Sequence, residues 1–230
     1  MDGCVPFLTL DIKGIEAGVA IGAIMLVFGG SFGLIAFGML FWFLFLSAIV
    51  TNVGITKKRK LGLYEKTRSY KNVFANGLVP MAIAVLFGIN AAHHFAPSVL
   101  IGIAYFSSVA AITADKFASE IGVLDGFPIS LISLRRVEKG TSGGVTVLGT
   151  FASAVGAALI GCMAFFLSHG ILSYVAFAAI IFVSGIIGNI ADSFLGYFEE
   201  KGIGNKYTSN FMCALAGAIV GVAIALLAGI

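Results

Sequence analysis

Long, almost uncharged apolar runs recur along the whole chain, and they restrict its fold more than any other feature. A helix needs about 20 consecutive apolar residues to cross a bilayer. Runs of this order lie at 30–50, 73–92, 97–114, 144–168, 172–190 and 209–229. Hydrophobic residues make up 59% of the 230 and charged residues 11%, a balance unlike that of soluble globular domains. The chain is therefore predicted to be a polytopic membrane protein.

The apolar runs predict helices rather than strands. A transmembrane barrel strand alternates apolar and polar residues over about ten positions, whereas these runs are continuous and rich in Gly and Ala, which favour close helix packing. We therefore predict an all-α fold, a polytopic transmembrane helical bundle of six spans in a single integral membrane domain over 1–230. A shorter apolar stretch at 15–28 is either a seventh span or a re-entrant or interfacial helix. No cleaved signal peptide is evident before it.

Basic residues are concentrated in three polar loops, at about 51–72, 115–143 and 191–208. These loops hold thirteen of the fourteen Lys and Arg residues, whereas the turns at 92–97 and 169–171 hold none. An excess of Lys and Arg marks the cytoplasmic side of a membrane protein. The three loops are therefore predicted to face the cytoplasm, with the protein in the cell membrane.

Two short motifs place carboxylates directly after apolar runs: Ala-Asp-Lys-Phe at 114–117 and Ala-Asp-Ser-Phe at 191–194. An ionised group near membrane depth has to be paired, bound to a metal or turned toward a polar cavity. Magnesium usually takes one or two carboxylates together with phosphate oxygens and water. Asp115 and Asp192 are therefore candidate ligands for Mg2+ bound with a nucleotide, the alternative being structural ion pairs.

Glu120 is a third candidate metal ligand. It follows Asp115 by five residues, about 140° around an ideal helix, so the two carboxylates share a metal only if the helix ends or unwinds there. The alternative is a pair between Lys116 and Glu120, which are four residues apart. Asn189 and Asp192, three residues apart, do share a helix face.

Arg68, Asn72 and Asn76 recur every four residues and predict a polar stripe on one helix. The stripe runs into an otherwise apolar span, where an amide without a partner is costly. We expect these residues to line a polar site, with hydrogen bonding between helices as the alternative.

The second loop combines paired arginines with a glycine-rich turn before a helix. Arg135 and Arg136 carry guanidinium groups that can hold phosphate bidentately, and Gly-Thr-Ser-Gly-Gly at 140–144 exposes backbone N–H groups at a helix N-terminus. We predict a phosphate site here, the alternative being an ordinary capped membrane helix after a flexible turn. The sequence has no P-loop pattern G-x-x-x-x-G-K-[ST].

In this order the motifs resemble those of the integral-membrane phytyl-phosphate kinase family, which includes the plant vitamin E pathway enzyme. The matching residues are Arg68, Asn72-x3-Asn76-Gly77-x2-Pro80, then Thr113-Ala114-Asp115-x3-Ser119-Glu120, then Arg136-Val137-x2-Gly140-Thr141-x-Gly143-Gly144, then Ala191-Asp192-Ser193-Phe194-Leu195-Gly196. The resemblance covers nearly the whole chain from about residue 10. In one departure, Lys116 stands where that family commonly has Thr.

The resemblance implies a kinase that converts an isoprenoid monophosphate, phytyl or geranylgeranyl phosphate, to the diphosphate, with Mg2+ and with CTP or another nucleoside triphosphate as donor. Phosphoryl transfer depends on charge neutralisation and alignment, which these polar residues can supply. The catalytic residues would be Asp115, Glu120, Asp192 and Arg136, with Asp115, Asp192 and Glu120 on the metal. Substrate contacts would come from Arg68, Asn72, Asn76, Ser119, Arg135, Lys139, Thr141, Gly143, Gly144, Asn189 and Ser193.

Two other functions fit the same residues. A membrane cytidylyltransferase that makes a CDP-lipid would use the same nucleotide and the same Asp, Arg and Gly chemistry. A polytopic transporter would account for the buried polar residues and for the two Ala-Asp-x-Phe copies, 77 residues apart. The expected partners are the isoprenoid monophosphate, the nucleotide and membrane lipid, with no nucleic acid, and a homo-oligomer is left open.

Overall fold

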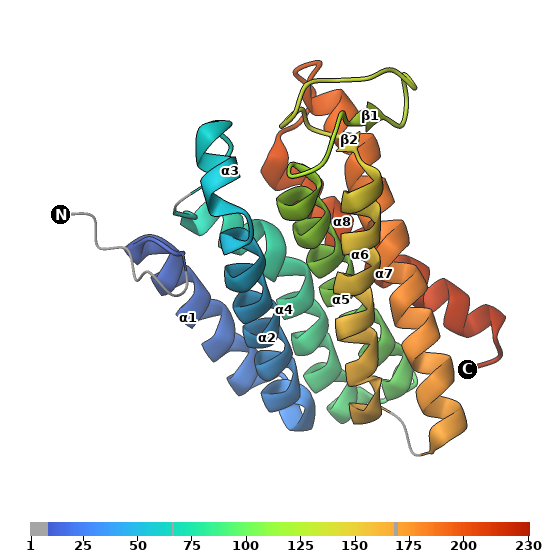
Figure 1. Ribbon diagram of the computed structural model, residues 1–230. Helices are drawn as coiled ribbons and strands as arrows, with labels where there is room; N and C mark the ends of the chain where they lie inside the picture. The colour runs from blue at the N-terminus through green and yellow to red at the C-terminus, as the bar shows by residue number, and fades with distance from the viewer. Residues whose placement is uncertain (1–8, 66, 168–169) are drawn as a thin grey trace.

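The computed structural model describes residues 9–65, 67–167 and 170–230, and these are helical almost throughout (Figure 1). The helices are α1 (Ile12–Phe28), η1 (Gly30–Phe32), α2 (Gly33–Asn52), α3 (Ile55–Lys60), α4 (Tyr70–His93), α5 (Ser98–Gly122), α6 (Val147–Gly161), η2 (Cys162–Phe166), α7 (Ile171–Glu199) and α8 (Lys206–Leu227). Two short strands, β1 (Ile129–Ser130) and β2 (Gly144–Val145), pair antiparallel. The predicted all-α fold is confirmed.

Six helical segments are long and apolar enough to cross a membrane, as the sequence predicts. They are Gly30–Asn52, Tyr70–His93, Ser98–Gly122, Val147–Phe166, Ser173–Glu199 and Lys206–Leu227. Two of them extend well beyond the predicted apolar runs, because no proline or left-handed residue interrupts α5 before Gly122 or α7 before Glu199. Both Ala-Asp motifs are consequently helical and do not lie in loops.

The additional apolar stretch forms α1, a helix of 17 residues that packs beside α2 and α4. Just before α1, Asp11 N donates to Arg68 O (3.1 Å) and Arg68 N donates to Thr9 O (2.8 Å), which ties its N-terminal end to the segment preceding α4. Its other end lies near the C-terminal part of α4, where Gly88 approaches the Phe28 carbonyl so closely that a Cβ would collide with it. The helix therefore runs between the same two levels as α4, which favours a seventh span over an interfacial helix.

The central helix is α5, which packs against α2, α4, α6, α7 and α8. Its residues 101–114 are all buried. Glycines on the neighbouring helices allow this close approach: a Cβ on Gly188 of α7 or on Gly217 of α8 would lie 2.5 or 2.6 Å from the Cβ of Ala111. Small residues at such contacts are the usual means of packing helices tightly in lipid.

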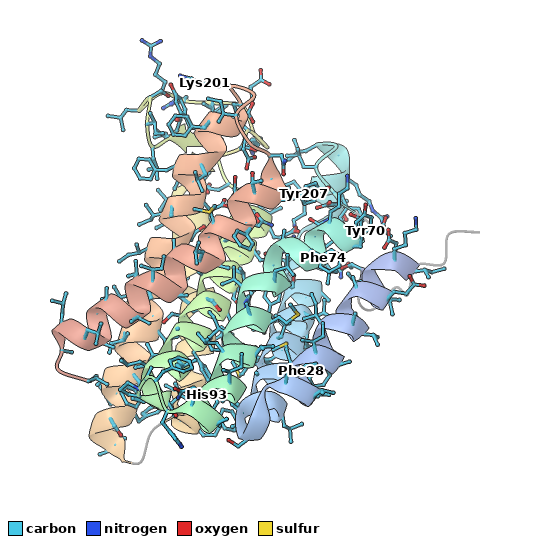
Figure 2. All side chains as sticks on the ribbon, turned by 180° about the vertical axis from the view of Figure 1, so that it is seen from behind. Phe28, Tyr70, Phe74, His93, Lys201 and Tyr207 are labelled. Atoms are coloured by element: carbon cyan, nitrogen blue, oxygen red, sulfur yellow. The ribbon has the colours of Figure 1, made fainter. Side chains whose placement is uncertain are left out.

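The polar segments gather at one end of the bundle, called here the polar end. In Figure 1 this end carries α3, β1 and β2. In Figure 2, Tyr70, Tyr207 and Lys201 lie toward it, and Phe28 and His93 lie at the opposite end. The regular up-and-down path of the helices therefore brings all three basic loops to the same end, as the sequence predicts.

Candidate functional site

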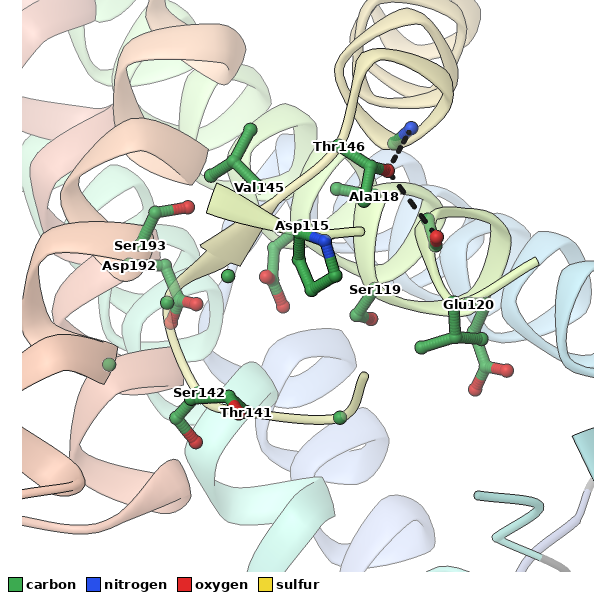
Figure 3. A pocket seen from close by; sticks show the side chains of 18 of the residues that line it. Asp115, Ala118, Ser119, Glu120, Thr141, Ser142, Val145, Thr146, Asp192 and Ser193 are labelled. Atoms are coloured by element: carbon green, nitrogen blue, oxygen red, sulfur yellow. Dashed lines mark hydrogen bonds between the residues drawn. The ribbon is translucent and has the colours of Figure 1, made fainter. Parts of the chain in front are cut away.

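A cavity of about 440 Å³, called here the polar cavity, opens at the polar end between α5, α6, α7, α8 and the segment after α3 (Figure 3). All three basic loops contribute to its wall, through 62–65, 139–146 and Lys206 among others. Ten of the predicted site residues line it. They are Asp115, Ser119, Glu120, Lys139, Thr141, Gly143, Gly144, Asn189, Asp192 and Ser193.

Asp115 of α5 and Asp192 of α7 face each other in this cavity. Their carboxyl groups lie within hydrogen-bonding reach of one another, and Figure 3 shows both side chains in the same part of the cavity. The Oδ1 atom of Asp192 is buried without a hydrogen-bond partner among the described residues. Two adjacent carboxylates repel each other unless a proton or a cation lies between them. The pair is therefore suited to hold a cation.

The donor set of this pair fits magnesium. Among the described residues, no group of three or more His, Cys, Asp or Glu side chains is placed to hold a metal by itself. Magnesium differs from zinc in needing only one or two carboxylates, because phosphate oxygens and water complete its coordination. Asp115 and Asp192 would supply those two carboxylates.

Glu120 does not join the aspartate pair. Because α5 stays helical past this position, the carboxylate of Glu120 is directed to a different side of the helix. It accepts hydrogen bonds from Lys58 Nζ (2.6 Å), Thr51 Oγ1 (3.0 Å) and Lys116 Nζ, and Arg68 Nη2 lies 3.7 Å away. Three cations thus surround the carboxylate, so the geometry does not support its predicted role as a metal ligand. The alternative pair with Lys116 is the one that forms.

Glu120, Lys58, Lys116 and Arg68 are called here the ion cluster. Lys58 is its most deeply buried member. Its side chain is 0% exposed, although it belongs to the short basic helix α3. Its ammonium group also donates to the carbonyls of Val50 (3.2 Å) and Thr51 (3.0 Å) at the end of α2. The basic run in the first loop therefore includes a structural lysine that fixes α3 against α2 and α5.

Arg68 joins the same cluster from the segment before α4. Its guanidinium donates to Ser47 Oγ and Thr51 Oγ1 on α2. Burial lowers the pKa of Arg68 below its usual value, while the negative charges of Glu120 and Glu65 act in the opposite direction. Three cations around one carboxylate give this cluster a net positive charge, next to a cavity whose lining also carries the carboxylates of Glu65, Asp115, Asp192 and Glu199.

The predicted stripe of Arg68, Asn72 and Asn76 does not line the polar cavity. Arg68 precedes α4, whose N-cap is Ser69, so the three residues do not form one helical face. They line a second cavity between α1, α2 and α4. Asn76 Nδ2 donates to Asn72 O (2.9 Å) within its own helix.

The two predicted phosphate-binding arginines also lie outside the polar cavity. Arg135 and Arg136 are exposed, and the guanidinium of Arg136 stacks over the ring of Phe127 at 5.6 Å. Their backbone is held by β1, because Ser130 N donates to Arg135 O (3.0 Å) and Ile129 forms a bridge with Arg136. Among the described residues, the basic side chains that line the cavity are those of Lys116, Lys139 and Lys206.

The glycine-rich turn packs directly on α7. Gly140 and Gly143 have positive φ values of 90° and 73°, which favour glycine. A Cβ on Gly196 would lie 2.8 Å from both the Cα of Gly143 and the carbonyl carbon of Ser142. Gly143 of the third motif and Gly196 of the fourth are therefore explained by one backbone contact that closes this side of the cavity.

Much of the hydrogen-bonding capacity of this turn is used internally. Ser142 N donates to Glu200 Oε1 (2.8 Å) and Gly144 N donates to Thr141 O (3.1 Å). Thr146 is the N-cap of α6, and its Oγ1 accepts from the N–H three residues later. The segment thus resembles the capped helix of the alternative interpretation, and it shapes the cavity wall more than it offers open N–H groups.

The polar lining residues that the sequence analysis did not predict include Glu199, Lys206 and Asn210. Lys206 Nζ pairs with Glu65 Oε2 at 3.1 Å, and Glu199 accepts a hydrogen bond from Ser209. The sequence does contain a signal for two of these residues. Lys206 and Asn210 are four residues apart at the start of an apolar span, which is the same spacing that singled out Asn72 and Asn76.

Comparison with known proteins finds relatives among membrane proteins. An uncharacterised membrane protein of Methanocaldococcus jannaschii is 41% identical over 219 residues, 94% of this chain and 85% of the relative. Protein PGR of Arabidopsis thaliana is 28% identical over 211 residues, 82% of this chain and 71% of that protein. No solved structure matches the chain. The model of the family described as integral membrane protein DUF92 matches residues 4–213, and this chain belongs to that family of integral membrane proteins.

Proposed function

We propose that this protein is a membrane phosphotransferase, a Mg2+-dependent kinase that transfers the terminal phosphoryl group of CTP or another nucleoside triphosphate to an isoprenoid monophosphate such as phytyl or geranylgeranyl phosphate. The observation that carries the proposal is the Asp115–Asp192 pair in a polar cavity at one end of a transmembrane bundle. The resemblance of the motifs to those of the phytyl-phosphate kinases supports the choice of acceptor.

The residues of the polar cavity suit this reaction. Asp115 and Asp192 would hold the magnesium ion, which when bound neutralises phosphate charge and orients the phosphate oxygens. Lys139 and Lys206 lie in the wall of the same cavity, where their charges would offset those of the triphosphate. An acceptor phosphate oxygen would form a bond to the terminal phosphorus as the bond to the bridging oxygen breaks. Because a phosphomonoester is already anionic near neutral pH, the acceptor needs no general base.

The proposal includes the sidedness of the site. The basic loops around the polar cavity favour the cytoplasmic side of the cell membrane, where nucleoside triphosphates are available. The acceptor would then enter from the bilayer with its phosphate at the polar end.

One assay tests the proposal. Purified protein is incubated with CTP, Mg2+ and geranylgeranyl or phytyl phosphate, and the products are identified, with a chelator of Mg2+ as the control. CDP and the isoprenoid diphosphate are expected. Pyrophosphate and a CDP-lipid would instead identify a cytidylyltransferase. Absence of turnover with CTP, ATP, GTP and UTP would overturn the kinase in favour of a transporter.

A further inference from the structure

A second cavity of about 250 Å³, called here the apolar groove, lies between α1, α2 and α4. Its polar lining residues, Arg68, Asn72 and Asn76, stand where α4 begins, toward the polar end. Its deeper part is apolar and includes Gly22 and Phe37, which lie in contact, since a Cβ on Gly22 would be 2.7 Å from Cε2 of that ring. This gradient from polar to apolar matches an amphiphile with its head group at the polar end.

The head of the groove contains an unsatisfied donor. Arg68 is 7% exposed, and its Nε is buried with no hydrogen-bond partner in the part of the chain that the structure describes. Its two terminal nitrogens already donate to Ser47 and Thr51. Asn72, also 7% exposed, lines the same end of the groove. Buried donors are normally paired, so the Nε–H of Arg68 calls for an acceptor that a ligand would provide.

The charge at this end favours an anionic ligand. Lys58, Lys116 and Arg68 carry three positive charges around the carboxylate of Glu120, and Glu65 adds a second negative charge that acts on Arg68, so the positive charges exceed the negative ones. A phosphate oxygen accepting from the free guanidinium N–H would form a charge-assisted hydrogen bond, which is shorter and stronger than a neutral one.

The groove is also open to the bilayer. Val19 of α1 and Phe41 of α2 line it and are 66% and 50% exposed, on a surface that faces lipid in a spanning bundle. A hydrocarbon chain can therefore enter sideways from the membrane without crossing the polar loops.

We propose that the apolar groove holds the isoprenoid monophosphate, with its chain between α1, α2 and α4 and its phosphate at Arg68 Nε and Asn72. The identity of this ligand rests on the proposed function. The position is suitable for the acceptor, because Arg68 Nη2 lies 3.7 Å from Glu120 Oε1 and Glu120 also lines the polar cavity. The ion cluster thus lies between the head of the groove, which Arg68 lines, and the polar cavity, which Lys116 and Glu120 line.

A glycine in the groove permits a clean test. Gly18 lines the groove, and a Cβ built on it meets nothing within 4 Å. Gly18→Leu would therefore occupy the space of the ligand without displacing protein atoms near the backbone. Gly38 of α2 is the matched control, since it also has open space around its Cβ but lies outside the groove lining. Both substitutions replace a helical glycine, which raises helix propensity.

Binding of geranylgeranyl phosphate is measured by equilibrium binding in detergent micelles, without nucleotide or Mg2+. We expect Gly18→Leu to bind at least tenfold more weakly than the wild type and Gly38→Leu to bind equally well. Geranylgeraniol, which has no phosphate, should bind the wild type more weakly than the phosphate does. Equal binding by Gly18→Leu, or no binding by the wild type, would overturn the groove assignment. If phosphatidic acid, which has two chains, displaces bound geranylgeranyl phosphate as effectively as geranylgeranyl phosphate itself does, the assignment of a single-chain ligand is overturned.

These outcomes are separable from those of the kinase assay. If the wild type makes isoprenoid diphosphate and Gly18→Leu keeps the same KM for the acceptor, the groove assignment is wrong and the kinase stands. If the wild type binds geranylgeranyl phosphate in a manner sensitive to Gly18→Leu but turns over with no nucleoside triphosphate, the kinase is wrong and the groove stands.

Discussion

At the scale of single residues, two kinds of acidic group lie within one helix. Asp115 on α5 meets a second carboxylate, that of Asp192, in a cavity. Glu120, five residues later on the same helix, meets Lys58, Lys116 and Arg68. The first arrangement needs a proton or a cation to offset its charges, whereas the carboxylate of the second already has cationic partners within the protein. Substitution of the aspartates should therefore affect turnover, whereas substitution of Glu120 should affect stability.

Replacement of either aspartate by asparagine should abolish turnover without harming the fold. Asp115→Asn and Asp192→Asn keep the side-chain volume and remove one of two repelling charges, so thermal stability measured without Mg2+ should stay the same or rise. The rate with CTP and geranylgeranyl phosphate should fall at least about 100-fold, because charge neutralisation by a metal is worth several kcal/mol. Asp125→Asn is the control, since the one side-chain hydrogen bond of Asp125 among the described residues is a long one, accepted from Leu148 N at 3.4 Å. More than about a tenth of the wild-type rate in either variant would contradict the assignment.

Loss of the charge on Glu120 should destabilise the fold. In Glu120→Gln the fully buried Lys58 loses its counter-charge, and breaking a buried pair costs about 3 kcal/mol or more in the free energy of unfolding. Glu65→Gln is the control, because its pair with Lys206 is exposed and such pairs are worth at most about 1 kcal/mol. Thermal denaturation in detergent compares the two. Equal stability of the two variants, together with a changed Mg2+ dependence for Glu120→Gln, would restore this residue as a metal ligand.

At the scale of elements, close contacts made at glycines set the positions of the site residues. The turn at 140–144 rests on Gly196 of α7, and the neighbouring helices reach α5 through Gly188 and Gly217. In each case the neighbouring atoms lie too close to the glycine to leave room for a Cβ. The aspartate pair depends on this close approach of α5 and α7.

Gly196→Ala should push the turn away from α7. The added Cβ would collide with the backbone of Gly143, and overpacking of this kind typically costs about 1–3 kcal/mol. Trypsin should then cleave after Lys139 faster than in the wild type, and the KM for the nucleotide should rise. Gly126→Ala serves as the control, because a Cβ there meets nothing within 4 Å. Unchanged cleavage in Gly196→Ala would show that the turn does not depend on this contact.

At the scale of the whole molecule, the bundle carries two cavities that meet at one ion cluster. The polar cavity lies among α5, α6, α7 and α8, and the apolar groove lies among α1, α2 and α4. Both have their polar lining at the polar end. The function proposed here therefore requires this end to face the cytoplasm.

Sidedness can be measured by thiol labelling in intact cells. In protein whose cysteines have been replaced, single cysteines are introduced at Ala92, at the end opposite the polar cavity, and at Ser133, in the second basic loop, both of which are exposed. A membrane-impermeant thiol reagent should label position 92 and not position 133, because basic loops stay on the cytoplasmic side. The reverse pattern would place the cavity on the side without nucleotide and would contradict the kinase. Labelling of both positions after permeabilisation is the control for accessibility.

The sequence by itself determined the membrane class, the six spans and the common side of the basic loops, because apolar run length and the distribution of Lys and Arg are local properties of the chain. It also singled out Asp115 and Asp192 as candidate site residues, since a carboxylate after an apolar run needs an explanation wherever the run packs, and both line the polar cavity.

Only the tertiary structure decided which partner each polar residue meets. Asp115 and Glu120 differ in surroundings because α5 continues as a regular helix and turns them toward different neighbours. Arg135 and Arg136 lie outside the cavity because β1 holds their backbone, and Lys206 lies inside it because α8 begins beside α7. The direction of a side chain depends on contacts between segments far apart in the chain, and the spacing of residues in the sequence does not contain them.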